Sequence, residues 1–445
     1  MNRRQFLTAL AAAPIALAAD PKPNIILIVG DDLGYADLGS YGCKDVPTPY
    51  LDSIAKNGVR FTDGYVSCPY CSPTRAGLMT GRYQTHFGHE FNPGPAEQAV
   101  AEFGLPLSET AMPKRLKDLG YKTGMFGKWH LGYKPAFHPQ QRGFDEFTGF
   151  LGGAHSFLDA EADPANPIFR GTSKVPKVEY TTDLFATEAA AFIDRNKDNP
   201  FFVYLPFNAV HTPLQALKKY EDRFEGKISD PRRKTMAAML SAMDDGVGLV
   251  LKSLEKHQLT SRTLLVFHSD NGGPTAANTS RNTPLRGFKS QVYEGGIRVP
   301  FLMQWPGQIP KGKVYPHPVI ALDMLPTFAA AAGATPSADW KLDGVNLLPF
   351  LTGKDKGVPH KHLFWRFGQQ WAMRDGDWKL MSMGDATVLY NLKTDIGEQK
   401  DLSAAEPARV EMMTAAWKAW DKNNIPAKWT SQRAGQKQKK KKKRA

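Results

Sequence analysis

The sequence predicts an α/β fold, with a large central sheet sandwiched by helices and a smaller antiparallel sheet plus one helix after it. Two observations support this prediction. Short apolar strands alternate with helical patterns up to about residue 355 of the 445-residue chain, and short aromatic strands follow. The length is sufficient for one large domain, or for a large and a small domain together.

Four apolar segments of the first part end in polar residues. The segments run from Asn24 to Val29, Tyr121 to Phe126, Phe201 to Leu205 and Thr263 to Phe267. Just beyond their C-terminal ends lie, in the same order, Asp31 and Asp32, Lys128 and His130, Asn208 and His211, and Asp270 and Asn271. Because ligands of open α/β sheets gather at the carboxyl ends of the strands, these residues are predicted to share one site.

Helical patterns separate these strands. They span Thr110 to Leu119, with Gly120 as the expected C-cap, then Thr182 to Asp194, and Thr235 to His257. The last pattern carries a stripe of methionine, leucine and valine at helical spacing, which indicates core packing and no cofactor site. Helices alternating with continuous apolar strands predict a sheet that is covered on both faces.

The pattern of predicted secondary structure changes near the stretch from Lys354 to His360. Short aromatic strands are expected at His362 to Phe367, Trp371 to Arg374, Trp378 to Ser382 and Val388 to Leu392, and a helix from about Ala404 to Asp421. We therefore predict four parts: a signal peptide (1–19), a catalytic domain (20–355), a C-terminal α+β subdomain (356–430) and a disordered polybasic tail (431–445).

The N-terminus has the pattern of a twin-arginine export signal. Arg3 and Arg4 precede an apolar run from Phe6 to Leu17, and small residues follow at a point where a signal peptidase could cut. The alternative is an anchor helix, but a run of about 12 apolar residues falls short of the roughly 20 that span a bilayer. The protein is expected to use the twin-arginine translocase and to be exported, either periplasmic or extracellular.

The formal charge of +13 lies largely at the two chain ends. Subtracting the nine charges of Arg3, Arg4, Lys437, Lys439 to Lys443 and Arg444 leaves +4 for the rest. The tail is then either a solvated segment or a means of electrostatic retention on an acidic polysaccharide or anionic lipid. Nucleic acid is not the expected partner of an exported protein.

The sharpest local pattern is Cys71-Ser72-Pro73-Thr74-Arg75, which continues as AGLMTGR to Arg82. Pro73 suits the first turn of a helix, Ser72 can cap it, and Gly81 can end it. Cys71 is thereby placed at a helix N-terminus, where backbone N–H groups, the helix dipole and Arg75 make an anion site around the sulfur.

This pattern matches the signature C-x-P-[ST]-R-x-x-x-[LM]-T-G-R, and the chain resembles the type I sulfatases of the alkaline phosphatase-like superfamily. The resemblance runs from about Lys22 to about Leu402. It implies the large mixed sheet of that superfamily, and oxidation of Cys71 to formylglycine by a separate maturation enzyme. Cys68 and Cys71 could instead form a redox dithiol or half of a zinc site, but no second cysteine pair or nearby histidine completes zinc.

By the same resemblance, Asp31, Asp32, Asp270 and Asn271 match the metal ligands, together with the modified Cys71. Oxygen donors from two strand ends, without imidazole, suit a hard cation, so calcium is the first choice and magnesium the second. Taken alone, an aspartate pair after a strand is often a helix cap or a turn.

The resemblance also extends to four further site residues. Lys128 and Lys289 would bind sulfate oxygens, His211 would protonate the leaving alkoxide or help to hold sulfate, and His130 would contact the formylglycine. One hydroxyl of the aldehyde hydrate would attack sulfur, and the other would expel sulfate with a base such as His130. His155 is a further candidate for the substrate pocket.

Within the family, the sequence resembles the branch that contains arylsulfatases and N-acetylgalactosamine-6-sulfatases. This resemblance favours a sulfated polysaccharide or oligosaccharide as substrate. Two other hypotheses remain open at this stage. One is a phosphate or phosphonate monoester hydrolase on the same scaffold. The other is a noncatalytic glycan-binding protein, which would be expected to lack Cys71, Arg75 or a metal ligand, whereas all are present here.

Overall fold

The computed structural model describes residues 22–96 and 103–430. The predicted signal peptide and polybasic tail lie outside these ranges. The main sheet has ten strands in the order β11-β2-β10-β9-β1-β8-β4-β5-β6-β7. At its centre β9 (Thr263–Ser269), β1 (Asn24–Gly30), β8 (Phe201–Pro206), β4 (Lys122–Lys128) and β5 (Glu146–Phe150) are parallel. The strands β10 (Phe301–Gln304), β2 (Val59–Phe61) and β6 (Phe169–Arg170) each pair antiparallel, so the sheet is mixed.

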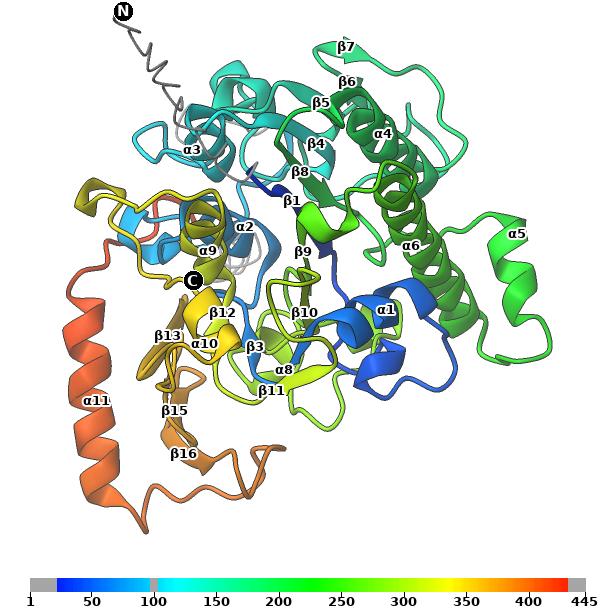
Figure 1. Cartoon of the computed structure of the whole chain (residues 1–445). Helices are drawn as coiled ribbons and strands as arrows, with labels where there is room; N and C mark the ends of the chain where they lie inside the picture. Colours follow the sequence, from blue (N-terminus) through cyan, green and yellow to red (C-terminus); the bar gives the residue numbers. More distant parts are fainter. Residues whose placement is uncertain (1–21, 97–102, 431–445) are drawn as a thin grey trace, which may run out of the picture.

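Both faces of the sheet are covered, as alternate residues of β1 show. Ile25, Leu27 and Val29 join a core with α2 (Cys71–Thr80), α3 (Met112–Asp118) and α9 (Met324–Ala331). Ile26 and Ile28 join a second core with α1 (Pro49–Asn57), α4 (Thr181–Asn196) and α6 (Pro231–Lys256). Figure 1 shows the strands passing between these two groups of helices. The predicted sandwich is therefore confirmed, and the methionine stripe of α6 is core.

The C-terminal sheet is antiparallel, as predicted, with the order β13 (His362–Phe367), β14 (Gln370–Asp375), β15 (Trp378–Ser382) and β16 (Thr387–Asn391). Helix α11 (Pro407–Asp421) lies beside it (Figure 1). One face of the sheet shares a core with the main body, where Leu363 and Trp365 join Tyr65 and Ile297. The division at residue 355 stays a prediction.

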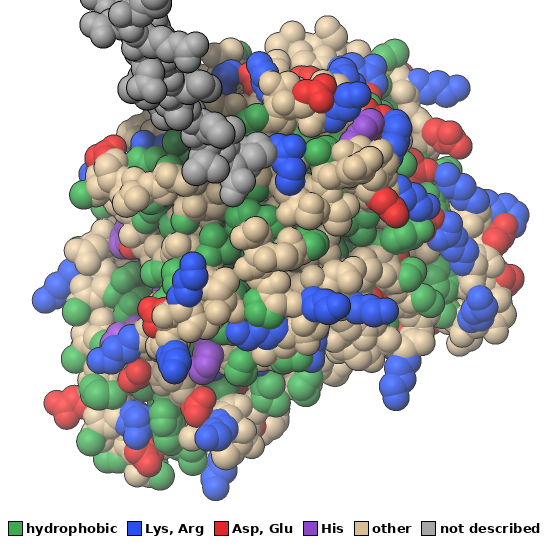
Figure 2. Space-filling view, viewed as in Figure 1, with side chains coloured by type: hydrophobic (Ala, Val, Ile, Leu, Met, Phe, Trp, Pro, Cys, Tyr) green, Lys and Arg blue, Asp and Glu red, His purple; other side chains and the backbone are tan. Residues whose placement is uncertain are grey.

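The remaining strands and α-helices of the described residues are short. They are β3 (Gly64–Tyr65), β7 (Ser173–Lys174), β11 (Lys313–Tyr315), β12 (Val319–Ile320), α5 (Lys218–Glu221), α7 (Thr275–Asn278), α8 (Glu294–Ile297) and α10 (Leu348–Thr352). Basic and acidic side chains are interspersed over the face seen in Figure 2. Over the described residues, none of the helices combines the length and apolar character that a bilayer crossing requires.

Candidate active site

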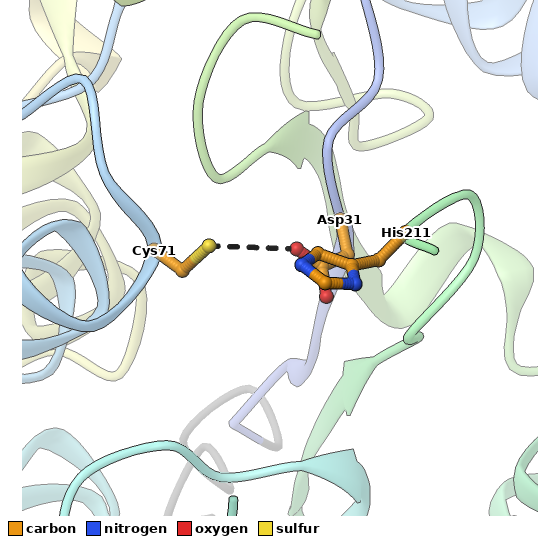
Figure 3. A group of neighbouring side chains, drawn as sticks. All are labelled: Asp31, Cys71 and His211. Atoms are coloured by element: carbon orange, nitrogen blue, oxygen red, sulfur yellow. Dashed lines mark hydrogen bonds between the residues drawn. The ribbon is translucent and has the colours of Figure 1, made fainter. Parts of the chain in front are cut away.

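The polar residues that follow the central strands meet at the carboxyl ends of those strands, as predicted. Asp31 and Asp32 follow β1, and Asp270 follows β9, its parallel neighbour. Ligand atoms of Asp31, Asp32, Asp270 and Cys71 all lie within 4.8 Å of one another. Each of these four side chains is at most 2% exposed. Figure 3 shows Cys71 facing Asp31, with Sγ 3.8 Å from Oδ1, and His211 beside Asp31.

Cys71 is the first residue of helix α2, which confirms its expected place at a helix N-terminus. The expected cap is wrong, because Tyr70 is the N-cap residue and Ser72 does not cap the helix. Instead the backbone N–H of Ser72 donates to Oδ1 of Asn92 at 3.1 Å. The Ser72 hydroxyl donates to the carbonyl of His130 at 2.6 Å and lies 2.6 Å from Nε2 of His89.

Burial raises the pKa of Cys71 to about 12, although Lys128 and Lys289 oppose the shift. The thiol is therefore protonated near neutral pH and is a poor nucleophile in this form. Cys68 is also buried and free, and it lies outside the metal-ligating groups found among the described residues. A redox dithiol or a zinc site at this pair gains no support.

Arg75 is fully buried one turn along α2. Its Nε and Nη2 donate to Oδ2 of Asp270 at 3.0 and 2.8 Å, and Nη1 donates to the carbonyl of Lys128 at 3.1 Å. Burial alone would raise the pKa of Asp270, but Arg75 and Lys128 hold it well below its usual range. Arg75 therefore fixes one carboxylate and the end of β4 together.

Two lysines neutralise the other carboxylates. Lys128 donates from Nζ to Oδ2 of Asp31 at 2.6 Å, and Lys289 lies 2.7 Å from Oδ1 of Asp32. Even so, burial and then Asp270 raise the pKa of Asp31 to about 7. Three cationic side chains thus face three buried carboxylates, and the raised pKa of Asp31 reflects its burial and its closeness to Asp270.

Asn271 completes the donor set. Its Nδ2 donates to Oδ1 of Asp32 at 2.7 Å and to the carbonyl of Gly272 at 3.0 Å. Its Oδ1 is buried and has no hydrogen-bond partner among the described residues. Three carboxylates and one uncommitted amide oxygen fit a hard cation such as calcium or magnesium.

The two histidines lie at the rim of this cluster. The Nε2 of His211 is 3.5 Å from Oδ2 of Asp32, and its Nδ1 is 2.6 Å from the carbonyl of Thr212. Burial lowers the pKa of His211 to about 4, although Asp32 opposes the shift. His130 is buried with φ 59°, and burial and Lys128 lower its pKa well below the ordinary value. A Cβ at Gly153 would lie 2.5 Å from Nε2 of His130, so that glycine makes room for the ring.

A cavity of 850 Å³ opens over this cluster. Asp32, Cys71, His130, His211 and Lys289 line it. His155 is not among the lining residues. It is buried with its ring 5.3 Å from that of Phe150, so the structure gives no support to its predicted role in substrate binding. The sequence analysis missed Asn92, His89, Tyr70 and Phe367, because their contacts with the site depend on tertiary structure and no local motif marks them.

Comparisons with known proteins identify the family. The family model described as sulfatase matches residues 23–334, and that described as N-sulphoglucosamine sulphohydrolase, C-terminal, matches residues 288–420. Human N-acetylgalactosamine-6-sulfatase is 33% identical over 395 residues, which cover 80% of this chain and 74% of the relative. The uncharacterized sulfatase YdeN of Escherichia coli K12 is 33% identical over 405 residues, covering 79% of this chain and 70% of YdeN.

Among solved structures, Ps i-CgsB in complex with k-i-k-neocarrahexaose superimposes with a TM-score of 0.87 and 39% identity, covering 93% of this chain and 96% of that one. The fold, the position of Cys71 at the start of helix α2 and the sequence matches over most of the chain all indicate the same family. The chain belongs to the sulfatase family of the alkaline phosphatase-like superfamily and is a sulfuric ester hydrolase.

Proposed function

We propose that this sulfatase removes sulfate from sulfated polysaccharides or oligosaccharides, with a formylglycine made from Cys71 beside a calcium ion. The observation that carries the proposal is the convergence of Cys71 with three carboxylates and the unpaired Oδ1 of Asn271. The glycan substrate is supported by the names of two similar proteins, an N-acetylgalactosamine-6-sulfatase and a structure in complex with k-i-k-neocarrahexaose.

Asp31, Asp32, Asp270 and Asn271 would hold the cation, with the modified Cys71. When present, the cation would supply Lewis-acid activation and the formylglycine hydrate would supply a hydroxyl nucleophile that the buried thiol cannot replace. Magnesium is the second choice of cation, because it demands near-ideal octahedral geometry and dehydrates reluctantly.

The remaining residues act on sulfate and on protons. Lys128 and Lys289 would bind the sulfate oxygens and stabilise the charge on the transferring group, with Arg75 holding Asp270 in place. Neutral His130 can accept a proton at a ring nitrogen. His211 would donate one from Nε2 to the leaving alkoxide, because bound sulfate would raise its low pKa.

The first experiment is mass spectrometry of the tryptic peptide from Phe61 to Arg75. This peptide contains both Cys68 and Cys71, so Cys68 is an internal control that should remain an alkylatable thiol. We expect an aldehyde at Cys71. Fully active enzyme with two alkylatable thiols would end the formylglycine hypothesis.

The second experiment compares substrates. Sulfate release is measured on two matched pairs: k-i-k-neocarrahexaose with galactose 4-sulfate, and a chondroitin 6-sulfate tetrasaccharide with N-acetylgalactosamine 6-sulfate. We expect turnover in at least one pair, and none on the corresponding phosphate esters. Preferential phosphate release would favour the phosphohydrolase hypothesis, and glycan binding without any turnover would favour the noncatalytic one.

We further propose export to the periplasm or the extracellular space, on the evidence of the sequence alone. Because Cys71 is only 1% exposed in the folded protein, the maturation enzyme would have to act before folding. The twin-arginine route carries folded proteins, so oxidation in the cytoplasm would precede transport. Cytoplasmic precursor that already carries the aldehyde is the expected finding.

A further inference from the structure

The cavity over the active site has both charged and aromatic residues in its lining. Asp32, His211 and Lys289 are charged or titratable, whereas Tyr70, Phe288 and Phe367 are aromatic. The Nζ of Lys289 lies 5.5 Å from the centroid of the Tyr70 ring, so the two groups of residues adjoin. At 850 Å³ the cavity lies in the upper part of the roughly 300–1,000 Å³ range of small-molecule sites, so it has room for more than one sulfated sugar. We name Tyr70, Phe288 and Phe367 the aromatic platform.

The platform joins three separate segments of the chain. Tyr70 precedes helix α2, Phe288 precedes the site residue Lys289, and Phe367 ends strand β13 of the C-terminal sheet. The ring of Phe367 contacts those of Tyr70 and Phe91, with centroids 5.4 and 5.2 Å away and the rings tilted by 42° and 52°. Two rings of the platform are therefore in contact, and one of them comes from the C-terminal sheet.

The C-terminal sheet also fixes the loop that carries Phe288 and Lys289. Gln370, in strand β14, donates from Nε2 to the carbonyl of Ser290 at 3.0 Å and accepts from the N–H of Val292 at 3.2 Å. The N–H of Ser290 donates to the carbonyl of Pro69 at 2.8 Å. Phe288 and Lys289 are thus held in one fixed segment, with Lys289 at Asp32 and Phe288 46% exposed in the cavity.

We propose that the aromatic platform is a subsite for the sugar ring next to the sulfated unit. The inference rests on the proposed function and names the part of the substrate that the platform recognises. The C–H groups on one face of a pyranose are apolar and carry slight positive charge, so they pack against the negative face of an aromatic ring. Asp163, in the same cavity lining, can accept hydrogen bonds from sugar hydroxyls.

The test uses the matched pair of substrates on which the parent enzyme is faster. The variants are Phe288→Ala and Phe367→Ala, with Phe367→Tyr to restore a ring and Leu107→Ala as control. Leu107 is 63% exposed and does not line the cavity. Because nearly half of Phe288 is exposed, its truncation is expected to leave the fold intact even if Phe367→Ala does not.

We expect each alanine variant to raise KM for the oligosaccharide about threefold to tenfold, the range for one lost aromatic contact. The kcat/KM for the sulfated monosaccharide should stay within about twofold of the parent value, and Phe367→Tyr should restore KM. Equal losses on both substrates, or no loss on either, would overturn the subsite while leaving the sulfatase function intact. If the parent enzyme released sulfate from no substrate, the proposed function and the subsite would fall together.

Discussion

The side-chain amide of Asn271 donates from Nδ2 to Oδ1 of Asp32 at 2.7 Å, across 239 residues of sequence. Its second N–H is directed to the carbonyl of Gly272, which fixes the orientation of the amide. The remaining oxygen, Oδ1, is buried and unpaired among the described residues, a state that costs about 1–3 kcal/mol. A cation ligated by this oxygen would remove that cost.

Calcium should therefore stabilise the folded protein. At a free concentration of about 100 times Kd, we expect a gain of about 2.7 kcal/mol in the free energy of unfolding, seen as a higher Tm than in a chelator. Calorimetry with calcium, with magnesium and with EDTA measures this gain. Asp270→Asn should abolish the calcium response. An equal response in parent and variant would place the ion elsewhere.

Arg75→Lys should preserve the positive charge but impair turnover. The guanidinium contacts Asp270 with two nitrogens and the carbonyl of Lys128 with a third, whereas one ammonium cannot reproduce this fork. We expect kcat to fall about 100-fold, the order of a lost preorganised donor. The loss of turnover could come directly from the missing guanidinium contacts or indirectly from loss of calcium. Metal content measured on the same samples distinguishes these two explanations, because loss of calcium would mean that Arg75 acts through the metal site alone.

The sequence was sufficient to predict the central strands and their polar ends. A continuous apolar run such as Asn24 to Val29 clearly indicates a buried strand when Asp31 and Asp32 follow it. Strands β13 and β15 also have the predicted bounds. By contrast, β2 and β11 are three residues long, and their pairing beside β10 depends on contacts far along the chain. No local pattern carries that information.

Within the site, residue types and spacing identified the charged cluster but not its support. Serine is a common helix-capping residue, but Ser72 does not cap α2. Its N–H donates to Oδ1 of Asn92, and its hydroxyl donates to the carbonyl of His130. His155 was a candidate for the substrate pocket, but it is buried with its ring against that of Phe150. Local sequence patterns do not show whether a side chain packs against a buried aromatic ring or faces a ligand.

His268 should make stability sensitive to acid. It is fully buried in β9, and burial lowers its pKa to about 4 from the ordinary 6.5. The unfolded chain binds a proton below pH 6.5 that the folded protein does not bind until about pH 4. The stability contributed by neutral His268 is therefore present above pH 6.5 and lost as pH falls towards 4.

The measurement is urea unfolding of the parent and of His268→Gln at pH 7.5 and pH 4.5. The parent should lose up to about 3 kcal/mol more than the variant over this interval, because other titrating groups are common to both proteins. Parallel losses in the two proteins would show that His268 has an ordinary pKa in the folded state.

Lys379 should be essential for attaching the C-terminal sheet. Its Nζ lies 2.9 Å from Oε1 of Glu294 and 2.8 Å from Oε1 of Glu398, and all three side chains are fully buried. Glu294 begins helix α8, five residues beyond the site residue Lys289, whereas Lys379 belongs to β15. Lys379→Met would leave the buried carboxyl group of Glu398 without its cation, whereas Glu294 keeps Arg298 at 3.3 Å. We expect a loss of about 3–5 kcal/mol in the free energy of unfolding.

A second substitution distinguishes lost charge balance from lost packing. Adding Glu398→Gln to Lys379→Met removes the uncompensated carboxyl group and should restore part of the stability. Lys218→Ala is the control, since its exposed pair with Asp222 should contribute nothing measurable. If the double variant were no more stable than Lys379→Met, the loss would have to come from packing of the lysine stem, because relief of buried charge would then have no effect.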